Sequence, residues 1–322
     1  MASKLRLTAA FGDYDRTGLL TKGQVVPEGI DLQVINLEPV ELFYRQCNFF
    51  EFEISEMSMG AHCHLISSKE SPFVGMPAFP SRAFRHSNIY YNVNSDIKSP
   101  KDLNGKRIAL LEWGMTAPLW VIGMLTEEYG LKINSVEWMV LKPSRVPIRF
   151  PENLNIKYIE KKKTLSDLLE SGEIDAAFLH EVPECFLRRS KEVRRLFPEY
   201  KSSEIEYFNR TGVYPIMHCV VLRKDIYQKY PWVLKSVYKA LLEARKKTLK
   251  ALWNNGAYAT MIPFLPSVME EMHKIFGQEI WPYGLSSNKI TLEKMIFYAQ
   301  QQGIISRSLE VQELFGESVI DD

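Results

Sequence analysis

A regular alternation of short apolar runs with helical segments constrains the fold of this chain more than any other feature. The short runs have the length and the Val, Ile, Phe and Tyr content of β-strands. They lie at residues 4–10, 31–37, 52–57, 73–79, 87–92, 108–111, 136–141 and 176–179. Segments of helical character separate them, at 39–46, 59–68, 117–129 and 164–170. Strands that alternate with helices form mainly parallel sheets, so the sequence predicts an α/β fold.

The last third of the chain has a different pattern. One more strand is expected near 215–221, and the residues after it are mostly helical. The expected helices span 231–253, 266–276 and 291–302. A chain of 322 residues is expected to form about two domains.

Composition argues against two classes of partner. Lysine and arginine number 40 against 39 aspartate and glutamate residues, and this net charge of +1 argues against nucleic acid. The longest apolar run extends only from Ala117 to Leu125, whereas a membrane-spanning helix needs about 20 residues. We therefore expect neither nucleic acid nor a membrane as a partner.

The N-terminal sequence and the cysteines indicate the compartment. The opening MASKLRLTAAFGDYDR lacks the basic segment and long apolar stretch of a secretory signal. The four cysteines, Cys47, Cys63, Cys185 and Cys219, form no CxxC pair and are expected to be reduced thiols. Both observations predict a cytoplasmic protein.

Four polar clusters follow expected strands, and they are the best candidates for a site. They lie at residues 13–16, 55–58, 112–116 and 180–184. Parallel α/β sheets bind ligands beyond the carboxyl ends of their strands. We therefore expect side chains of these clusters to contact a ligand.

The sequences of these clusters also carry a resemblance to a known family. The stretches GDYDRTGLL, VVPEGIDLQVINLEPVELFYR, FEFEISEMSMG, FPSRAFRHSNIYYN, DLNGKRIALLEWGMTAPLWVIGML, GVYPIMHCVVLRKD and WPYGLSSNKITLEKMIFYAQQQGII resemble 4,5-dihydroxyphthalate decarboxylases. They occur in the same order and cover nearly the whole chain. The resemblance implies the two-lobed α/β fold of type II periplasmic binding proteins, with a ligand cleft between the lobes.

The resemblance also implies a discontinuous domain organisation. Lobe 1 would hold residues 1–94 and 214–322, and lobe 2 would hold residues 95–213. The chain would cross between them near 92–95 and 210–214. Substrate binding would close the lobes and exclude water.

Three histidines are candidates for the site. His86 and His218 would transfer protons, although His86 could be a hydrogen-bonded histidine at a strand edge and His218 a buried structural one. His180 follows an expected strand and would bind substrate, unless it lies in a surface loop.

The remaining candidates bind hydroxyl groups, carboxylates or the substrate more generally. Asp13 and Glu56 would contact phenolic hydroxyls or act as bases, unless Asp13 only shapes its turn. Arg16, Arg82 and Arg85 would bind carboxylates, because a guanidinium forms paired hydrogen bonds with them, or would be exposed charges. The other predicted substrate-binding residues are Tyr14, Ser55, Met115 and Thr116, of which the last two open a helix whose free amides favour an anion.

No organic cofactor is expected. The sequence has no Walker loop, no HExxH motif and no GxSxG elbow, and Gly12 alone is no dinucleotide fingerprint. His62 and His64 lie two residues apart on an expected helix, so they point about 200° apart and cannot readily share a metal. A divalent metal stays open, because catechols and carboxylates chelate metals.

The function that the resemblance implies is decarboxylation of a hydroxylated aromatic acid such as 4,5-dihydroxyphthalate, in aromatic acid degradation. A base would take a phenolic proton, an acid would protonate the ring carbon that bears the carboxylate, and CO2 would leave as aromaticity returns. A non-catalytic solute-binding protein and a lyase for another small acid are the alternatives. An apolar patch on the C-terminal helices could pair subunits into a homo-oligomer.

Overall fold

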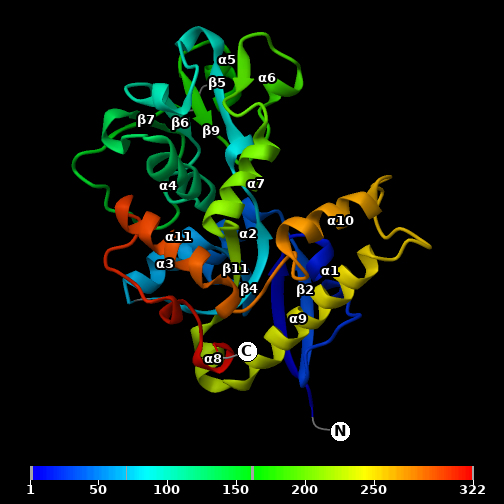
Figure 1. Cartoon of the computed structure of the whole chain (residues 1–322). Helices are drawn as coiled ribbons and strands as arrows, with labels where there is room; N and C mark the ends of the chain where they lie inside the picture. Colours follow the sequence, from blue (N-terminus) through cyan, green and yellow to red (C-terminus); the bar gives the residue numbers. More distant parts are fainter. Residues whose placement is uncertain (1–2, 70, 161–162, 321–322) are drawn as a thin grey trace. The chain divides into compact units, whose positions relative to one another are not determined.

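The computed structural model describes residues 3–69, 71–160 and 163–320 (Figure 1). Its contacts divide the chain into two compact units. Unit 1 comprises the residues up to Arg82, His218–Leu292 and the segment from Leu309 onward. Unit 2 comprises Ala83–Met217 and Glu293–Ser308. The α/β prediction is confirmed in both units, each of which contains one sheet and several helices.

The units change at different residues from the predicted lobe boundaries. The predicted crossings lie at 94/95 and 213/214, whereas the units change at 82/83 and 217/218. Residues 293–308, which comprise most of α11 (Lys289–Gln301) and the turn after it, also belong to unit 2. The lobe boundaries and the cleft between lobes stay predictions.

Unit 1 is built on a five-stranded mixed sheet. The strand order is β2-β1-β3-β11-β4. These strands are β1 (Leu5–Phe11), β2 (Ile30–Asn36), β3 (Ile54–Ser58), β4 (Phe73–Arg82) and β11 (Ile216–Arg223). β1 runs parallel to β2 and β3, whereas β11 runs antiparallel to β3. A strand from late in the chain is thereby inserted beside β3.

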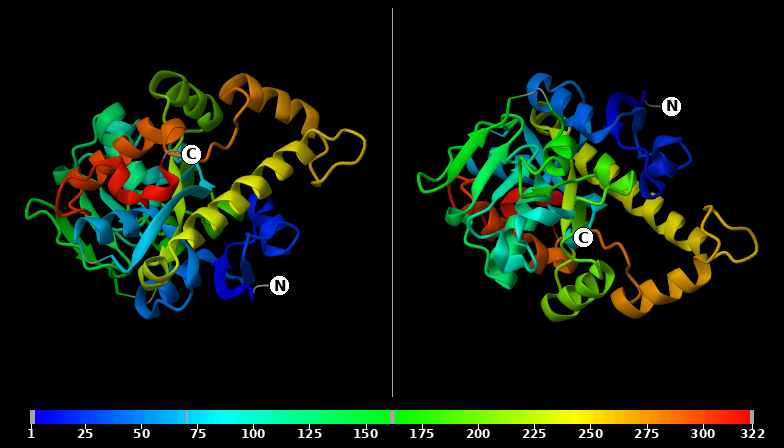
Figure 2. Two further views of the ribbon diagram at one scale, coloured as in Figure 1. Left: turned by 90° about the horizontal axis from the view of Figure 1, so that it is seen from below. Right: turned by 90° about the horizontal axis from the view of Figure 1, so that it is seen from above.

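The helices of unit 1 follow from local sequence signals. They are α1 (Asp15–Thr21), α2 (Pro39–Phe49), α3 (Met59–Ser67), α8 (Lys224–Lys229), α9 (Trp232–Leu252) and α10 (Leu265–Phe276). α2 begins at Pro39, where the missing N–H costs nothing. α9 buries one face, with Val233, Val237, Leu241 and Ala244 at helical spacing. Helices α9 and α10 are joined by the loop at 253–264 and form the yellow and orange hairpin in Figure 2.

Unit 2 is built on a six-stranded sheet. The order is β10-β5-β9-β6-β7-β8. These strands are β5 (Ile89–Asn92), β6 (Arg107–Leu110), β7 (Glu137–Val140), β8 (Asn155–Tyr158), β9 (Ala176–Phe178) and β10 (Val193–Arg195). β6 runs parallel to β7 and β9, and β7 to β8, whereas β5 runs antiparallel to β9 and β10. Its helices are α4 (Thr116–Tyr129), α5 (Leu165–Glu170), α6 (Glu184–Leu187), α7 (Tyr200–Thr211) and α11.

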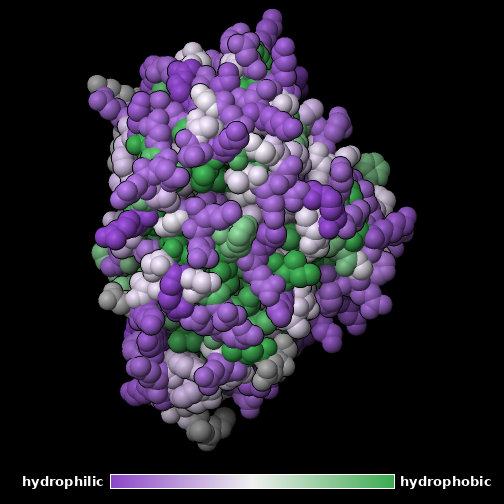
Figure 3. Space-filling view, turned by 60° about the vertical axis from the view of Figure 1, so that its left-hand side comes forward, coloured by the Kyte–Doolittle hydropathy of each residue, from purple (hydrophilic) through white to green (hydrophobic). Residues whose placement is uncertain are grey.

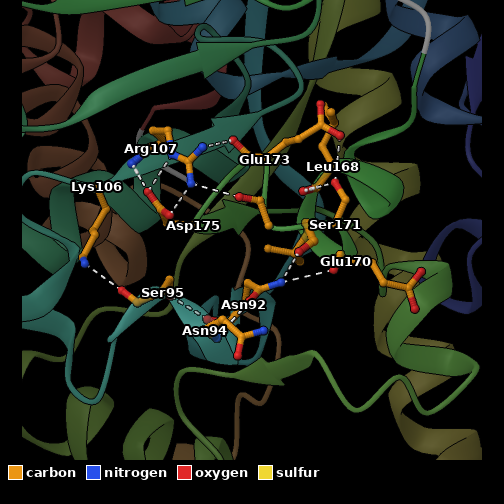
Figure 4. A network of polar contacts seen from close by, with 12 residues as sticks. Asn92, Asn94, Ser95, Lys106, Arg107, Leu168, Glu170, Ser171, Glu173 and Asp175 are labelled. Carbon is orange, nitrogen blue, oxygen red and sulfur yellow. Dashed lines mark hydrogen bonds and ion pairs between the residues drawn. The ribbon is translucent and has the colours of Figure 1, made fainter.

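A polar network fixes the strands of unit 2 at one end of its sheet (Figure 4). Arg107 of β6 forms a paired contact with Asp175, with Nη2 2.7 Å from Oδ1 and Nε 3.1 Å from Oδ2. The same guanidinium donates to the carbonyls of Gly172 and Glu173. Asn92 at the end of β5 donates to the carbonyl of Leu169 in α5. These contacts hold β5, β6 and β9 in register at this end of the sheet.

The surface carries polar and apolar side chains in mixed order. On the face shown in Figure 3, hydrophobic side chains stand in small groups between hydrophilic ones. None of the helices in the described ranges combines the length and the hydropathy needed to cross a membrane.

Candidate active site in unit 1

A buried glutamate at the centre of the unit 1 sheet is the strongest candidate for a functional group. Glu56 lies on β3 and has no solvent exposure. A buried carboxylate is costly unless it accepts hydrogen bonds. Glu56 accepts from the backbone N–H of Gly12 at 3.0 Å and from the hydroxyl of Tyr14 at 3.0 Å. It also contacts His218, whose Nδ1 lies 2.5 Å from its Oε1.

Strand register places His218 beside Glu56. In the antiparallel pair of β3 and β11, His218 lies opposite Ser58 and Val220 lies opposite Glu56. His218 and Glu56 are therefore diagonal neighbours on one face of the sheet, within reach of long side chains. A shift of one residue in this register would move His218 to the other face.

The contact with Glu56 determines which nitrogen of His218 can react. A carboxylate accepts only, so Nδ1 carries the proton and Nε2 is the remaining nitrogen. The imidazole packs edge-on against Phe43 at a centroid distance of 4.7 Å, and the side chain is 17% exposed. Nε2 has no hydrogen-bond partner among the residues of the described ranges. The Glu56–His218 pair therefore fixes the imidazole and leaves its Nε2 accessible.

Tyr14 lies back over Gly12. A Cβ atom at Gly12 would lie 2.4 Å from Cζ and 2.5 Å from the hydroxyl oxygen of Tyr14, which no real structure allows. Glycine is therefore needed for Tyr14 to reach Glu56. Burial and then the negative charge of Glu56 raise the pKa of Tyr14, so its hydroxyl stays protonated and donates.

Arg16 lies between two aromatic rings beside this network. Its Cζ is 4.2 Å from the ring centroid of Tyr14 and 4.5 Å from that of Trp281. Its Nε donates to the carbonyl of Pro80, and its Nη1 lies 3.2 Å from Asp15. Trp281 is held in turn by a 2.8 Å hydrogen bond from its Nε1 to the carbonyl of Phe79. The stacking restricts the guanidinium to one orientation.

The structure brings four of the predicted site residues together in unit 1: Tyr14, Arg16, Glu56 and His218. Ser55 lies beside Glu56 on β3, and its buried hydroxyl lacks a partner within the described residues. Asp13 is exposed. Arg82 is buried and donates through Nη2 to the carbonyl of Pro282 at 2.8 Å and to the side chain of Asn288. Their predicted roles stay predictions.

The other predicted residues lie in unit 2. His86 is fully buried, 3.2 Å from the hydroxyl of Tyr129 and packed edge-on against Phe197 and Tyr207. Burial, followed by the charge of Arg210, lowers the pKa of His86 to about 4. This environment is that of a neutral core histidine, whereas the sequence offered either a proton-transfer group or a hydrogen-bonded histidine at a strand edge.

Arg85 and the opening of α4 also belong to unit 2. Arg85 directs Nε at the sulfur of Met217, 3.3 Å away, and burial lowers its pKa to about 10. Met115 is the N-cap of α4, and Thr116 is its buried first residue.

His180 lies in a cavity of about 530 Å³ within unit 2, lined in part by Leu111, Lys142 and Glu181. Leu111, Lys142 and His180 follow β6, β7 and β9, so the cavity lies at the carboxyl ends of these strands. Burial lowers the pKa of His180, although the adjacent Glu181 opposes the shift.

Within the described ranges, no three His, Cys, Asp or Glu side chains are grouped as metal ligands are. His62 lies on α3 and contacts the carbonyl of Leu314 at 2.7 Å. Burial lowers the pKa of His62 to about 4.

Sequence reasoning missed three residues that complete the site: Gly12, Phe43 and Trp281. Gly12 was considered only as part of a dinucleotide motif, and its adjacency to Tyr14 was the available signal. Trp281 lies in the WPYG stretch that carried the resemblance. Nothing in the sequence pattern distinguishes Phe43 from any other buried residue of α2.

Two known relatives of the chain have the same name. No family model matches the chain. A 4,5-dihydroxyphthalate decarboxylase of Comamonas testosteroni is 32% identical over 319 residues, which is 97% of each chain. A 4,5-dihydroxyphthalate decarboxylase of Pseudomonas putida is 32% identical over 212 residues, which is 64% of this chain and 82% of the relative.

Solved structures show the fold. The periplasmic sulfonate-binding protein SsuA of Methylobacillus flagellatus aligns with a TM-score of 0.59 at 16% identity, over 98% of this chain and 92% of its own. The alkanesulfonate-binding protein SsuA of Xanthomonas axonopodis aligns with a TM-score of 0.52 at 14% identity, over 98% and 99%. The fold is that of the two-lobed periplasmic binding proteins.

Proposed function

The chain belongs to the 4,5-dihydroxyphthalate decarboxylase family, and from this we propose that it is a carboxy-lyase acting on a hydroxylated aromatic carboxylic acid. The observation that carries the proposal is 32% identity over 97% of both chains. The unit 1 site supports it, because it combines a proton-transfer group, hydrogen-bonding groups for hydroxyls and a cation for a carboxylate.

The reaction needs three proton movements. In 4,5-dihydroxyphthalate each carboxylate is para to a hydroxyl group. Loss of the phenolic proton pushes electrons into the ring, and the carbon bearing the carboxylate then takes a proton to give a dienone. The bond to the carboxylate breaks, CO2 leaves, and its electron pair restores the aromatic ring. The phenolate that remains takes back a proton, so the net change is uptake of one proton and release of one CO2.

We assign the proton transfer to His218. Its Nδ1–H is held by Glu56, so Nε2 can accept a proton as neutral imidazole and donate one as imidazolium. Glu56 is a positioning residue that fixes the tautomer and stabilises the charged ring. His86 is the weaker candidate, because its ring is enclosed by Tyr129, Phe197 and Tyr207.

Arg16 is assigned to the carboxylate that stays on the ring. Its stacked guanidinium is restricted before substrate arrives, which reduces the entropy lost on binding. Tyr14 would contact the hydroxyl groups of the substrate, whereas Ser55 lies on the opposite face of β3 from Glu56, because successive side chains of a strand alternate between faces.

The remaining expectations are part of the proposal. We propose a cofactor-independent enzyme of aromatic acid degradation that is located in the cytoplasm, and the four free cysteines support a reducing compartment. Pairing of subunits through the exposed apolar side chains of the α9–α10 hairpin is proposed as well, on the exposure of Trp253, Met261 and Phe264.

The proposal is tested by CO2 release from 4,5-dihydroxyphthalate and a panel of hydroxybenzoates, with and without EDTA. We expect turnover of at least one hydroxylated acid at a rate that EDTA does not change. Turnover lost to EDTA would contradict the cofactor-independent mechanism. Binding without CO2 release across the panel would favour a solute-binding protein, the function of the fold's sulfonate-binding neighbours.

A further inference from the structure

A cavity of unit 1 lies between α1, α9 and α10, and Arg16 lines it, whereas neither Glu56 nor His218 does. Its volume is about 230 Å³. Most of its wall is apolar and comes from α9 and α10, with Leu249, Leu252, Val268, Met269 and Met272 among the lining residues. Figure 2 shows these two helices, in yellow and orange, diverging from the loop that joins them. The wall of the cavity is therefore mainly apolar, and most of it comes from α9 and α10.

One part of the wall is polar. Arg16 and Arg245 supply two cations there, and Asp15 supplies one carboxylate. The hydroxyl of Thr248 donates to the backbone carbonyl of Asp15 at 3.0 Å and is already used. The other lining hydroxyl is that of Thr260.

Two buried donors of this polar part lack partners. Arg245 is 8% exposed, and its Nη1 contacts Glu279 at 2.5 Å and the carbonyl of Trp281 at 2.7 Å. Its Nε and the hydroxyl of Thr260 are buried without a hydrogen-bond partner among the described residues. Native proteins leave few buried donors unpaired, so each such donor calls for a partner, which a bound ligand can supply. Both of these donors belong to residues that line the same cavity.

We propose that this cavity binds a small amphipathic monocarboxylate, with its carboxylate at Arg245 and Thr260 and its apolar tail between α9 and α10. A carboxylate accepts hydrogen bonds and matches both unpaired donors. The volume is below the 300–1,000 Å³ or so typical of drug-sized ligand sites, so the ligand is small.

The charges select a monoanion. Arg16 already lies 3.2 Å from the carboxylate of Asp15, which also lines the cavity, so Arg245 is the one cation that faces a ligand. Glu279 also contacts Arg245, but its side chain is 61% exposed, so solvent screens its charge. A dicarboxylate such as 4,5-dihydroxyphthalate would place its second charge against apolar side chains, which is costly. The inference does not depend on the proton transfer proposed for His218, although Arg16 and Trp281 belong to the Glu56–His218 site and also line this cavity.

The probe for this site is hexanoate, with hexanamide as its uncharged analogue. We expect calorimetric titration of the full chain to show hexanoate binding, and hexanamide to bind at least about tenfold more weakly, because charge-assisted hydrogen bonds are about twice as strong as neutral ones. Equal binding of the two compounds, or no binding of hexanoate, would overturn the proposal.

Two variants localise the binding. Met272→Trp fills the cavity and should abolish hexanoate binding, whereas Met261→Trp is the matched control, because Met261 is fully exposed and does not line the cavity. Thr260→Val removes an unpaired hydroxyl at nearly constant shape, so it should weaken hexanoate binding severalfold without lowering the melting temperature. Hexanoate binding that persists in Met272→Trp, or that Thr260→Val leaves unchanged, would overturn the assignment.

Discussion

The Nδ1 atom of His218 lies 2.5 Å from Oε1 of Glu56, although 162 positions separate the two residues in the chain. The carboxylate is buried and also accepts hydrogen bonds from Gly12 and Tyr14. A histidine held in this way has one fixed tautomer and one nitrogen available for proton transfer. This pair is the basis of the mechanism proposed for the enzyme.

Glu56→Gln tests the positioning role of the carboxylate. The amide keeps the size of the side chain but removes the charge that stabilises an imidazolium at His218. We expect kcat to fall by about 10²-fold or more while KM changes little, because general acid–base catalysis contributes about 10²–10⁴-fold.

The matched control for that variant is Glu51→Gln. Glu51 is a partly exposed glutamate whose Oε2 accepts from Arg45 at 2.7 Å, and it makes no contact with the site. The activity of Glu51→Gln should equal that of the wild type. A full-rate Glu56→Gln enzyme would remove Glu56 from the mechanism.

Gly12→Ala tests the requirement for glycine beneath Tyr14. The new methyl group would lie 2.4 Å from the phenol ring, so Tyr14 must move away from Glu56. We expect activity to fall at least about tenfold and the melting temperature to fall, because a buried carboxylate loses a hydrogen bond. Both effects can be measured on one preparation by an activity assay and a thermal melt.

Gly18→Ala provides the comparison. Gly18 lies on α1, and nothing lies within 4 Å of a Cβ atom built there. Alanine is the better helix former, so this variant should be as stable as the wild type or more stable by up to ~1 kcal/mol. Equal behaviour of the two variants would show that Tyr14 does not depend on Gly12.

His86 makes stability depend on pH. Its folded pKa of about 4 lies below the ordinary value of 6.5, so between these values the unfolded chain binds the proton and the folded chain does not. Stability is therefore fully present above about pH 6.5 and is lost as the pH falls towards 4. His62, with a folded pKa of about 4, contributes in the same direction.

Urea unfolding at pH 7.5 and pH 4.5 measures this dependence. We expect the free energy of unfolding to fall by a few kcal/mol on acidification, and the loss to be about halved in His86→Gln, because His62 still titrates. The comparison at two pH values separates titration of His86 from the packing lost in the variant. If His86→Gln loses as much stability on acidification as the wild type does, His86 does not contribute to the pH dependence.

The fold could be predicted from the sequence because its signals are local. The apolar runs that became β1, β6 and β7 and the helices between strands follow from residue periodicity over short windows. The antiparallel insertion of β11 beside β3 could not be predicted, because strand order depends on contacts between distant segments. The contact of His218 with Glu56 depends on that insertion, so sequence analysis named both residues without pairing them.

His86 is a residue for which the local sequence suggested a site but the structure gives a core environment. The sequence places it after Arg85 and before an apolar run, a context that suits a site. Its ring is instead enclosed by Tyr129, Phe197 and Tyr207, which come from three separate segments. The enclosure depends on tertiary packing, which no local pattern reports.

The most direct test of the central claim is CO2 release by the wild type and by His218→Gln and His86→Gln under identical conditions. If His218 transfers the proton, His218→Gln loses about 10²–10⁴-fold in kcat, while His86→Gln keeps its rate at pH 7.5 as long as it is folded. Full activity in His218→Gln, or a loss confined to His86→Gln, would contradict the assignment of proton transfer to the Glu56–His218 pair.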